Sequence, residues 1–216
     1  MRNWLDPWPA ISDLFSGLLV ASFAGLILFA GVSGIERVRE QRVRRHADEI
    51  RDKVLESLQT SLTGASRECG VEEICFDIAI QFETDQDRIK PPYKEAIGRA
   101  CSALRETLGT FDRRQIEIVI EGHTDSRQPQ RAASPRDAYL YNWRLSSNRA
   151  SSVLYEFAQC GVKPPDHRIF AIGYADSDSV PGCEADTETC NAVNRRTTFR
   201  LRPDKNQIKN DLADRQ

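Results

Sequence analysis

The sequence predicts an α+β protein in three parts: a single N-terminal transmembrane helix, a helical stalk, and a C-terminal βαβαββ domain whose mixed sheet carries helices on one face. Three observations predict this fold class. Residues 14–34 form an uncharged run of 21 residues, long enough to cross a bilayer as a helix. A charge-dense segment with a thin apolar stripe follows the run. Strand-type and helix-type hydrophobic spacings then alternate through residues 70–203.

The composition fits one membrane span joined to one globular domain. The chain has 216 residues, of which 40% are hydrophobic, and its formal charge is −2. Its 30 basic and 32 acidic residues are interspersed, so the sequence does not favour a nucleic-acid partner. It also lacks a nucleophile paired with a base, a phosphate-binding loop and a metal-ligand cluster. We therefore expect neither enzyme activity nor a bound cofactor.

We interpret the apolar run as an uncleaved anchor, with a short cytoplasmic tail at 1–12 and the transmembrane helix at 13–34. A cleaved signal peptide is the alternative, but the run is too long, Asp6 accompanies Arg2 before it, and no A-x-A site follows. A lipoprotein is not favoured either, because no cysteine lies near the end of the run.

An acid, Asp13, stands at the start of this helix. Gly17, Ala21 and Gly25 follow it at steps of four and lie on the same helical face, where small residues allow a second helix to approach closely. A charged side chain at the bilayer centre costs ~2.5–3.5 kcal/mol on insertion scales, so such acids usually have a function. The alternative is that Ser12 or Asp13 only caps the helix N-terminus.

The segment 35–66 predicts a helical stalk or linker that ends near Thr63-Gly64. Its apolar stripe is narrow, which favours a helix pairing with its own copy over a helix packed on a broad core. A solvated single helix is the alternative. The stripe consists of Ile35, Val38, Val43, Ala47, Ile50, Val54, Leu58 and Leu62.

The region 70–203 predicts one domain, followed by a C-terminal tail at 204–216. Alternation of apolar and polar residues indicates strands, and apolar residues repeated every three to four positions indicate helices. In chain order the predicted elements are a strand in CFDIAIQF, a helix after Pro91-Pro92, a strand in QIEIVIEG, a helix in NWRLSSNRASSVLYEFAQCG, and strands in RIFAIGY and RTTFRLR.

The cysteines and the arginines disagree about where this domain lies. An even number of cysteines with close local pairs is typical of disulfides in an oxidising compartment, although six buried thiols would also fit. Several arginines follow the span whereas only Arg2 precedes it, and the positive-inside rule would therefore place the domain in the cytoplasm. The possible disulfides join Cys69 with Cys75, Cys183 with Cys190, and Cys101 with Cys160.

Four blocks of the domain carry a resemblance to a known family. EGHTD, NWRLSSNRA, GVKPPDHRIFAIGYADS and NRRTTFRLR occur in that order, and together they resemble the OmpA-like peptidoglycan-binding domain. Two stretches depart from the family pattern: a long loop over 126–141, and GCEADTETC, which resembles an insertion closed by a disulfide.

The resemblance implies that Asp125 and Arg149 hold the diaminopimelate of a peptidoglycan stem. The chemistry is sound, because an aspartate accepts hydrogen bonds from an ammonium group and an arginine donates a bidentate pair to a carboxylate. Alternatively, Asp125 is only a turn residue after the strand, and Arg149 is only a solvated charge on the helix. We expect His123 to hold a loop rather than a metal ion. Supporting residues at the same site are expected to be Thr124, Asn142, Leu145, Ser146, Arg195 and Arg196.

A second resemblance covers the membrane helix. WPAISDLFSGLL resembles the W-x-x-x-x-D-L-M-x-x-L-L opening of stator B subunits of the MotB type. It implies that Asp13 carries a translocated proton or sodium ion, that the chain is a single-pass bacterial inner-membrane protein, and that the domain lies in the periplasm. It also implies a homodimer surrounded by a pentameric MotA-like membrane subunit, with peptidoglycan as a further partner.

Three departures from flagellar stators favour the ZorB type, found in Zorya anti-phage defence systems with a pentameric ZorA-like subunit. The tail before the span is short, the stalk follows the membrane directly, and cysteine pairs are present. A flagellar stator subunit is the first alternative. A passive structural anchor that joins the inner membrane to the cell wall is the second.

Overall fold

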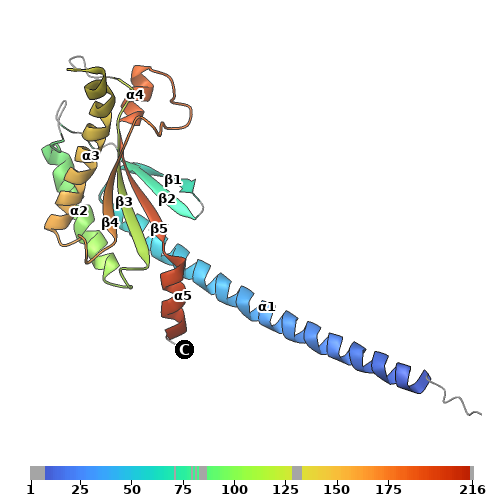
Figure 1. Cartoon of the computed structure of the whole chain (residues 1–216). Helices are drawn as coiled ribbons and strands as arrows, with labels where there is room; N and C mark the ends of the chain where they lie inside the picture. Colours follow the sequence, from blue (N-terminus) through green and yellow to red (C-terminus); the bar gives the residue numbers. More distant parts are fainter. Residues whose placement is uncertain are drawn as a thin grey trace, which may run out of the picture. The chain divides into compact units, whose positions relative to one another are not determined.

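The computed structural model describes residues 8–70, 72–78, 80, 82, 87–127 and 133–214, with side chains from residue 12 onward. These residues form two compact units, within 1–45 and 46–216, and helix α1 (Trp8–Gln59) contributes to both (Figure 1). Of the expected tail at 1–12, residues 1–7 lie outside the described residues, and residues 8–12 are already helical.

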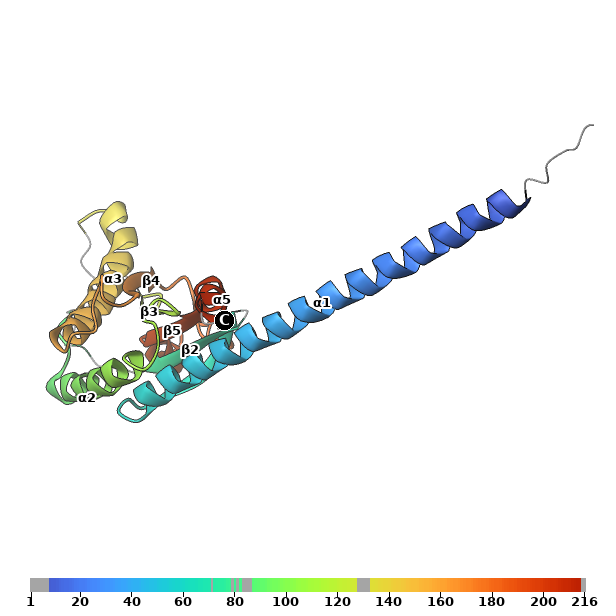
Figure 2. The same cartoon turned by 90° about the horizontal axis from the view of Figure 1, so that it is seen from below.

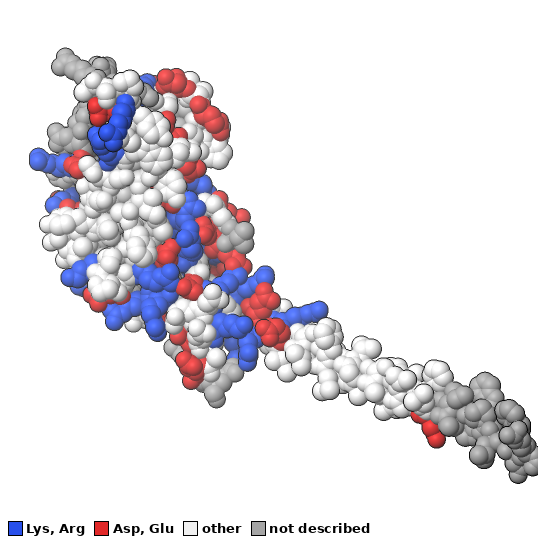
Figure 3. Space-filling view, in the orientation of Figure 1, with Lys and Arg blue, Asp and Glu red and all other residues white. Residues whose placement is uncertain are grey.

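The first unit is the N-terminal part of α1. Its most apolar stretch has a mean hydropathy of 2.3, and by length and composition it is the one described segment suited to crossing a membrane. Large apolar side chains are exposed along it, including Leu14 at 65% and Phe29 at 74%. Figure 3 shows a long stretch of this helix without charged side chains. Such a surface requires lipid or another apolar partner around it.

The second unit contains one five-stranded mixed sheet with the strand order β1-β2-β5-β3-β4. Strands β3 and β4 are parallel and joined through α3, whereas the other neighbouring strands are antiparallel. The elements are β1 (Gly64–Gly70), β2 (Glu73–Ile78), α2 (Pro91–Leu108), β3 (Ile116–His123), α3 (Pro135–Gln159), β4 (Ile169–Ala175), α4 (Glu188–Asn194), β5 (Thr197–Pro203) and α5 (Lys205–Asp214).

Helices α2 and α3 lie on the same side of the sheet, and this arrangement confirms the predicted fold class (Figures 1 and 2). The alternating residues of the central strands explain the packing. Phe76 pairs with Phe199, which also pairs with Ile120, and all three side chains are fully buried. The ring of Phe157 on α3 lies 5.4 Å from that of Phe199. The helices thus cover the apolar face of the sheet.

The last turns of α1 correct our interpretation of the stalk. Ala47, Ile50, Val54 and Leu58 are at most 3% exposed, because this part of the stripe packs within the second unit rather than on another copy. Ser57 Oγ lies 2.5 Å from Thr107 Oγ1 at the end of α2. Only the beginning of the stripe stays open, where Ile35 is 67% and Val38 56% exposed.

Several element boundaries also differ from the prediction. The segment Gly64–Gly70 is an edge strand rather than the end of a linker, and the expected C-terminal tail contains α5, whose Ile208 is fully buried. Strand β2 ends at Ile78, and Phe82 forms an isolated bridge with Ile89. Helix α3 starts at Pro135, inside the stretch expected to be a long loop.

The six cysteines form three disulfides within the second unit. Cys69 joins Cys75 across the β1–β2 hairpin, with their Cα atoms 5.7 Å apart. Cys101 on α2 joins Cys160 at the end of α3, at a Cα separation of 6.3 Å. Cys183 joins Cys190 across the segment that leads into α4, at 4.8 Å. These pairs are those considered from the sequence, and their separations suit disulfide geometry.

Gly122 sets how closely α3 approaches β3. A Cβ atom at this position would lie 2.9 Å from the carbonyl carbon of Ser146 and still closer to its oxygen. We expect Gly122→Ala to lower the free energy of unfolding by about 3 kcal/mol, because neither backbone can easily give way. Urea unfolding checks this expectation. Gly98→Ala, on α2 with open space around it, is the matched control and should not destabilise the domain; equal stability of both variants would contradict the packing argument.

Candidate functional site

The candidate site lies where β3 ends. His123 is the last residue of the strand, and Thr124 N donates a hydrogen bond to Ala175 O at 2.8 Å, which ties the loop to the end of β4. Ser146 Oγ on α3 accepts a hydrogen bond from Ala175 N at 3.0 Å. The close approach at Gly122 therefore brings the loop after β3, the end of β4 and the middle of α3 together.

Asn142 fixes the loop that carries Asp125. Its Nδ2 atom donates to the carbonyl oxygens of Asp125, at 3.2 Å, and Arg127, at 3.1 Å. Asn142 and Ser146 are both buried, with Leu145 half-buried beside them on the same helix. Asn142 therefore positions the loop, while Ser146 holds the end of β4.

The carboxylate of Asp125 is mostly shielded, at 13% exposure, and it accepts a hydrogen bond from Arg195 at 2.6 Å. Its other oxygen accepts from Arg127 N at 3.2 Å. Arg149 lies about one helical turn beyond Ser146, with its guanidinium 4.9 Å from the ring centroid of Phe82. The structure thus pairs the acid of the predicted site with Arg195, for which we expected only a supporting role.

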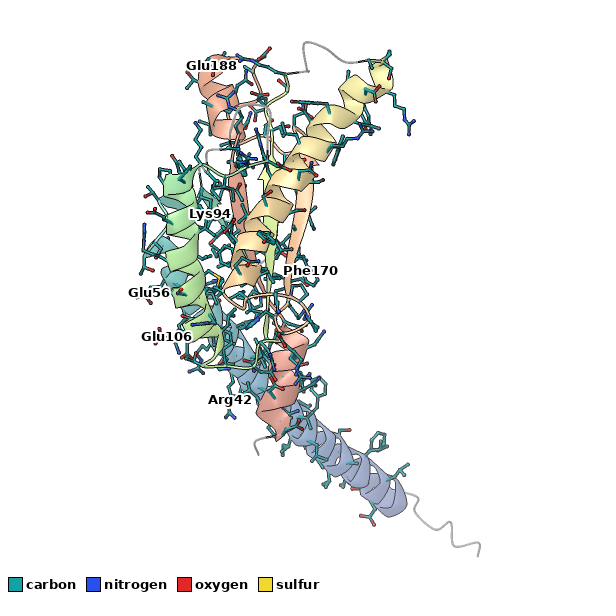
Figure 4. The ribbon with its side chains drawn as sticks, turned by 90° about the vertical axis from the view of Figure 1, so that its left-hand side faces the viewer. Arg42, Glu56, Lys94, Glu106, Phe170 and Glu188 are labelled. Carbon is teal, nitrogen blue, oxygen red and sulfur yellow. A yellow bond between two sulfur atoms is a disulfide. The ribbon has the colours of Figure 1, made fainter. Side chains whose placement is uncertain are left out.

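Glu188 joins two arginines at the edge of this site. The Glu188 carboxylate lies 2.6 Å from Arg127 and 3.0 Å from Arg195; of the three residues, Glu188 is labelled in Figure 4. Hydrogen bonds from Arg195 and then Arg127 lower the pKa of Glu188. Burial alone would lower the pKa of Arg195, but its bonds to Asp125 and Glu188 outweigh burial and raise it. The sequence prediction missed Glu188, whose only signal was its place in GCEADTETC, one of the two stretches that depart from the family pattern. Arg127 belongs to the long loop for which we considered a role in covering the pocket or contacting a glycan, but its pairing with Glu188 was not predicted.

Arg196 and His123 belong to the charged face of the sheet, which lies opposite the apolar face that α2 and α3 cover. Arg196 is 5% exposed and lies 3.2 Å from the carboxylate of Asp178. His123 is 1% exposed and stacks on Tyr174 at 5.5 Å. Among the described residues, no three acidic, histidine or cysteine side chains are placed to hold a metal ion. We assign both residues to support of the sheet.

The acids of this charged face predict a pH dependence of stability. Burial raises the pKa of Glu121, but His123 and the Arg200 guanidinium, 2.5 Å away, outweigh burial and hold it below its ordinary value. The pKa of Asp77 is likewise lowered, because bonds from Thr198 and Arg67 outweigh its burial. A lowered pKa in the folded state means that the unfolded chain binds protons first as the pH falls.

We therefore expect these two acids to leave the free energy of unfolding unchanged near neutral pH and to lower it as the pH falls below about 4, their ordinary pKa. Burial also lowers the pKa of His167, so this group adds a loss of stability that begins as the pH falls below the ordinary value of a histidine. Glu121→Gln should give a shallower decrease, although it also lowers stability at neutral pH. Urea unfolding at several pH values measures both effects. Glu106→Gln, an exposed position on α2 (Figure 4), is the control and should keep the wild-type slope. Stability that rises on acidification would contradict the account.

Asp13 is the second candidate site. Helix α1 begins at Trp8, so Asp13 lies in its second turn and is not the N-cap residue. In the single chain the side chains of Asp13 and Ala21 are exposed. Gly17 and Gly25 are also exposed, with open space where a Cβ atom would lie. At steps of four, these residues share one face of the helix. The acid is therefore placed among residues that admit a close neighbour.

A five-stranded mixed sheet with a parallel β3–α3–β4 unit and helices on one face defines a small α+β domain. The model of the OmpA family matches residues 81–194, more than half of the chain, and the chain therefore belongs to the OmpA family. No curated protein sequence gives a significant match.

Three solved structures are similar in fold to this chain. A putative MotB-like protein from Desulfovibrio vulgaris is 21% identical, with a TM-score of 0.55, over 76% of this chain and 95% of that one. A periplasmic fragment of Helicobacter pylori MotB is 17% identical, with a TM-score of 0.51, over 69% and 94%. The cell wall anchor of the type VI secretion system of Pseudomonas aeruginosa is 20% identical, with a TM-score of 0.50, over 71% and 96%.

Proposed function

We propose that this chain is the peptidoglycan-anchored, ion-conducting subunit of an inner-membrane motor of the stator type, driven by proton or sodium motive force. One observation carries the proposal: an acid inside an exposed apolar helix and an OmpA-family domain occur in the same chain. The similarity of the domain to MotB structures supports it. The apolar helix would cross the inner membrane once, with the domain in the periplasm, where disulfides persist.

The wall-binding half of the proposal assigns the diaminopimelate end of a peptidoglycan stem to Asp125 and Arg149. Asp125 would accept hydrogen bonds from the ligand ammonium while keeping its bond to Arg195, since a carboxylate has about four acceptor sites. Arg149 would donate a bidentate pair to the ligand carboxylate. Thr124 adds a buried Oγ1 atom that has no hydrogen-bond partner among the described residues.

The ion-carrying half assigns the proton or sodium ion to Asp13. Removal from water favours the neutral or ion-paired form of a carboxylate, and contact with water favours the free anion, so alternating exposure lets the group load and release an ion. Each elementary charge that crosses the membrane gains ~2.3 kcal/mol per 100 mV. The small residues along the same helical face would let a second copy, as a homodimer, and a surrounding pentameric MotA/ZorA-like subunit approach the acid.

Among motors of this kind, we place the chain with the Zorya anti-phage defence systems rather than with flagella. Two features support this choice: the disulfides, and the direct continuation of the apolar segment into the rest of α1. In the described part of the chain, α1 runs without a break into the domain and leaves no loose linker between them.

A passive anchor between inner membrane and cell wall is the second candidate. Its support is the similarity of the domain to the cell wall anchor of a secretion system. In that case the helix would need no acid beyond a cap, and the position of Asp13 in the second turn of α1 does not favour a cap.

Titration of the detergent-solubilised full chain with a soluble stem peptide that ends in meso-diaminopimelate tests the wall-binding function common to both candidates. We expect saturable binding that the free amino acid meso-diaminopimelate competes away. Absence of binding would overturn both candidates.

The same titration tests the role of Glu188. Its carboxylate occupies Arg127 and Arg195 beside Asp125, where it competes with an anionic ligand for those donors. We expect Glu188→Gln to bind the stem peptide several-fold more tightly, since the ion pairs of this exposed carboxylate are screened by solvent and easily displaced. Glu184→Gln, in the same disulfide-closed segment, is the control and should bind as wild type. Weaker binding by Glu188→Gln would show instead that the pair supports the site.

A further inference from the structure

We propose that the arginine collar of α1, residues 36–45, binds the phosphate groups of anionic phospholipids on the domain side of the membrane. This inference rests on the proposed crossing of the membrane by α1, and it depends on neither ion transport nor wall binding. The collar begins just after the uncharged run of residues 14–34, where charged side chains appear in Figure 3. It contains five exposed arginines: Arg37, Arg39, Arg42, Arg44 and Arg45.

The charge of α1 changes sign along the helix. The five arginines and the two acids Glu36 and Glu40 give the collar a net charge of +3. Residues 48–56 hold four acids and two bases, a net charge of −2, and their bases lie within 3.0 Å of carboxylates on the preceding turn. The surplus of arginine is thus confined to the turns that adjoin the apolar segment, which is the pattern of a segment attracted to an anionic membrane surface.

The arginines surround the helix instead of lining one face of it. Successive residues of a helix are turned by about 100°, so the five side chains cover more than half of its circumference. The remaining face carries Glu36 and Glu40 and continues into Val43, which is 6% exposed. A protein neighbour contacts a helix along one face, whereas lipid headgroups surround it. The distribution therefore favours lipid over an acidic protein partner.

The depth of the collar suits the headgroup layer, which is about 5–8 Å thick on each side of the hydrocarbon core. At about 1.5 Å per residue, Arg37 and Arg39 lie about 5 and 8 Å beyond Gly34. Helical side chains lean toward the N-terminus, which is here the membrane side, so Arg42 (labelled in Figure 4) also reaches back toward the headgroups. Because α1 is unbroken from Trp8 to Gln59, headgroup contact at the collar would fix the depth of Asp13 in the membrane.

Separate titrations with two phospholipids test the inference on the delipidated full chain in a neutral detergent. The first probe is phosphatidylglycerol, which is anionic. The second is phosphatidylcholine with the same acyl chains, which is zwitterionic. Native mass spectrometry measures how many molecules of each lipid remain bound.

The test variant combines Arg37→Gln, Arg39→Gln and Arg42→Gln, and a second variant places lysine at the same three positions to keep the charge. The matched control removes an equal charge from exposed arginines outside α1, by combining Arg99→Gln, Arg113→Gln and Arg114→Gln.

We expect the wild type to prefer phosphatidylglycerol to phosphatidylcholine, and the glutamine variant to bind phosphatidylglycerol about tenfold more weakly. The lysine variant and the control should behave as wild type. Equal binding of the two lipids by the wild type, or an unchanged preference in the glutamine variant, would overturn the inference and leave the collar to an acidic protein partner.

Extraction of native membranes at alkaline pH tests the membrane crossing separately. A chain that stays in the membrane but shows no lipid preference refutes the role of the collar alone. A chain that is released refutes the crossing on which this role rests.

Discussion

Replacing Asp13 by asparagine is expected to abolish motor activity in the native host while the protein remains at normal levels in the membrane. Asparagine keeps the shape of the side chain but can neither release a proton nor pair with sodium as an anion. The helix should still insert, because a neutral amide is easier to bury than a carboxylate. The readouts are phage plaque formation and swimming in the presence of the neighbouring genes, with the membrane fraction checked by blot.

A matched control separates this effect from general damage to α1. Asp52→Asn changes an acid of the same helix that lies outside the apolar segment and pairs with Arg51 at its surface. This variant should behave as wild type, since exposed ion pairs contribute at most about 1 kcal/mol. Loss of plaque protection would identify a defence motor, and loss of swimming a flagellar one. Full activity of Asp13→Asn would leave the passive anchor as the function of the chain.

Replacing Asp125 by asparagine is expected to weaken binding of the stem peptide about 100-fold. The ligand ammonium loses a charge-assisted hydrogen bond, and Arg195 loses the acid that it contacts at 2.6 Å. Together these losses correspond to about 2–3 kcal/mol. Calorimetric titration of the full chain measures the change directly, and urea unfolding excludes a loss of the fold.

The control for Asp125 is Asp166→Asn, an exposed acid that lies 3.4 Å from Arg113, outside the candidate site. Its affinity for the stem peptide should equal that of wild type. Arg149→Lys tests the other half of the site, because lysine keeps the charge but cannot form the planar, bidentate pair with a carboxylate. Stem binding that survives both Asp125→Asn and Arg149→Lys would mean that the ligand is held elsewhere.

The main strands and helices of the domain could be predicted because their burial follows their periodicity. Strand β3 alternates Ile116, Ile118 and Ile120, which are all buried under the helices. Strand β1 could not be predicted, since GASRECG is a mostly exposed edge strand without alternating apolar residues. Helix α5 buries Ile208 alone among its residues, so it leaves no helical pattern.

The partner of an apolar stripe cannot be read from its spacing. The residues from Ala47 to Leu58 satisfied the pattern of a self-pairing helix, yet they are buried within their own domain. An apolar stripe with one residue per turn can pack against a second helix or against the helix's own domain equally well. Tertiary context decided between the two.

The candidate site was predictable where its residues belong to local blocks. Asn142, Ser146 and Arg149 occur at steps of three or four on one helix, so their common face follows from the helix period. Glu188 was not predictable. It meets Arg127, 61 positions earlier in the chain, through the packing of α4, and charge pairing between distant segments has no local signal.

Co-sedimentation of the full chain with purified sacculi measures whether diaminopimelate anchors the chain to the cell wall. Sacculi whose stems carry meso-diaminopimelate are compared with sacculi that carry lysine at that position, with free meso-diaminopimelate as competitor. We expect the chain to bind sacculi with meso-diaminopimelate alone and to be released on addition of the competitor. Equal binding to both kinds, or binding that the competitor leaves unchanged, would contradict it.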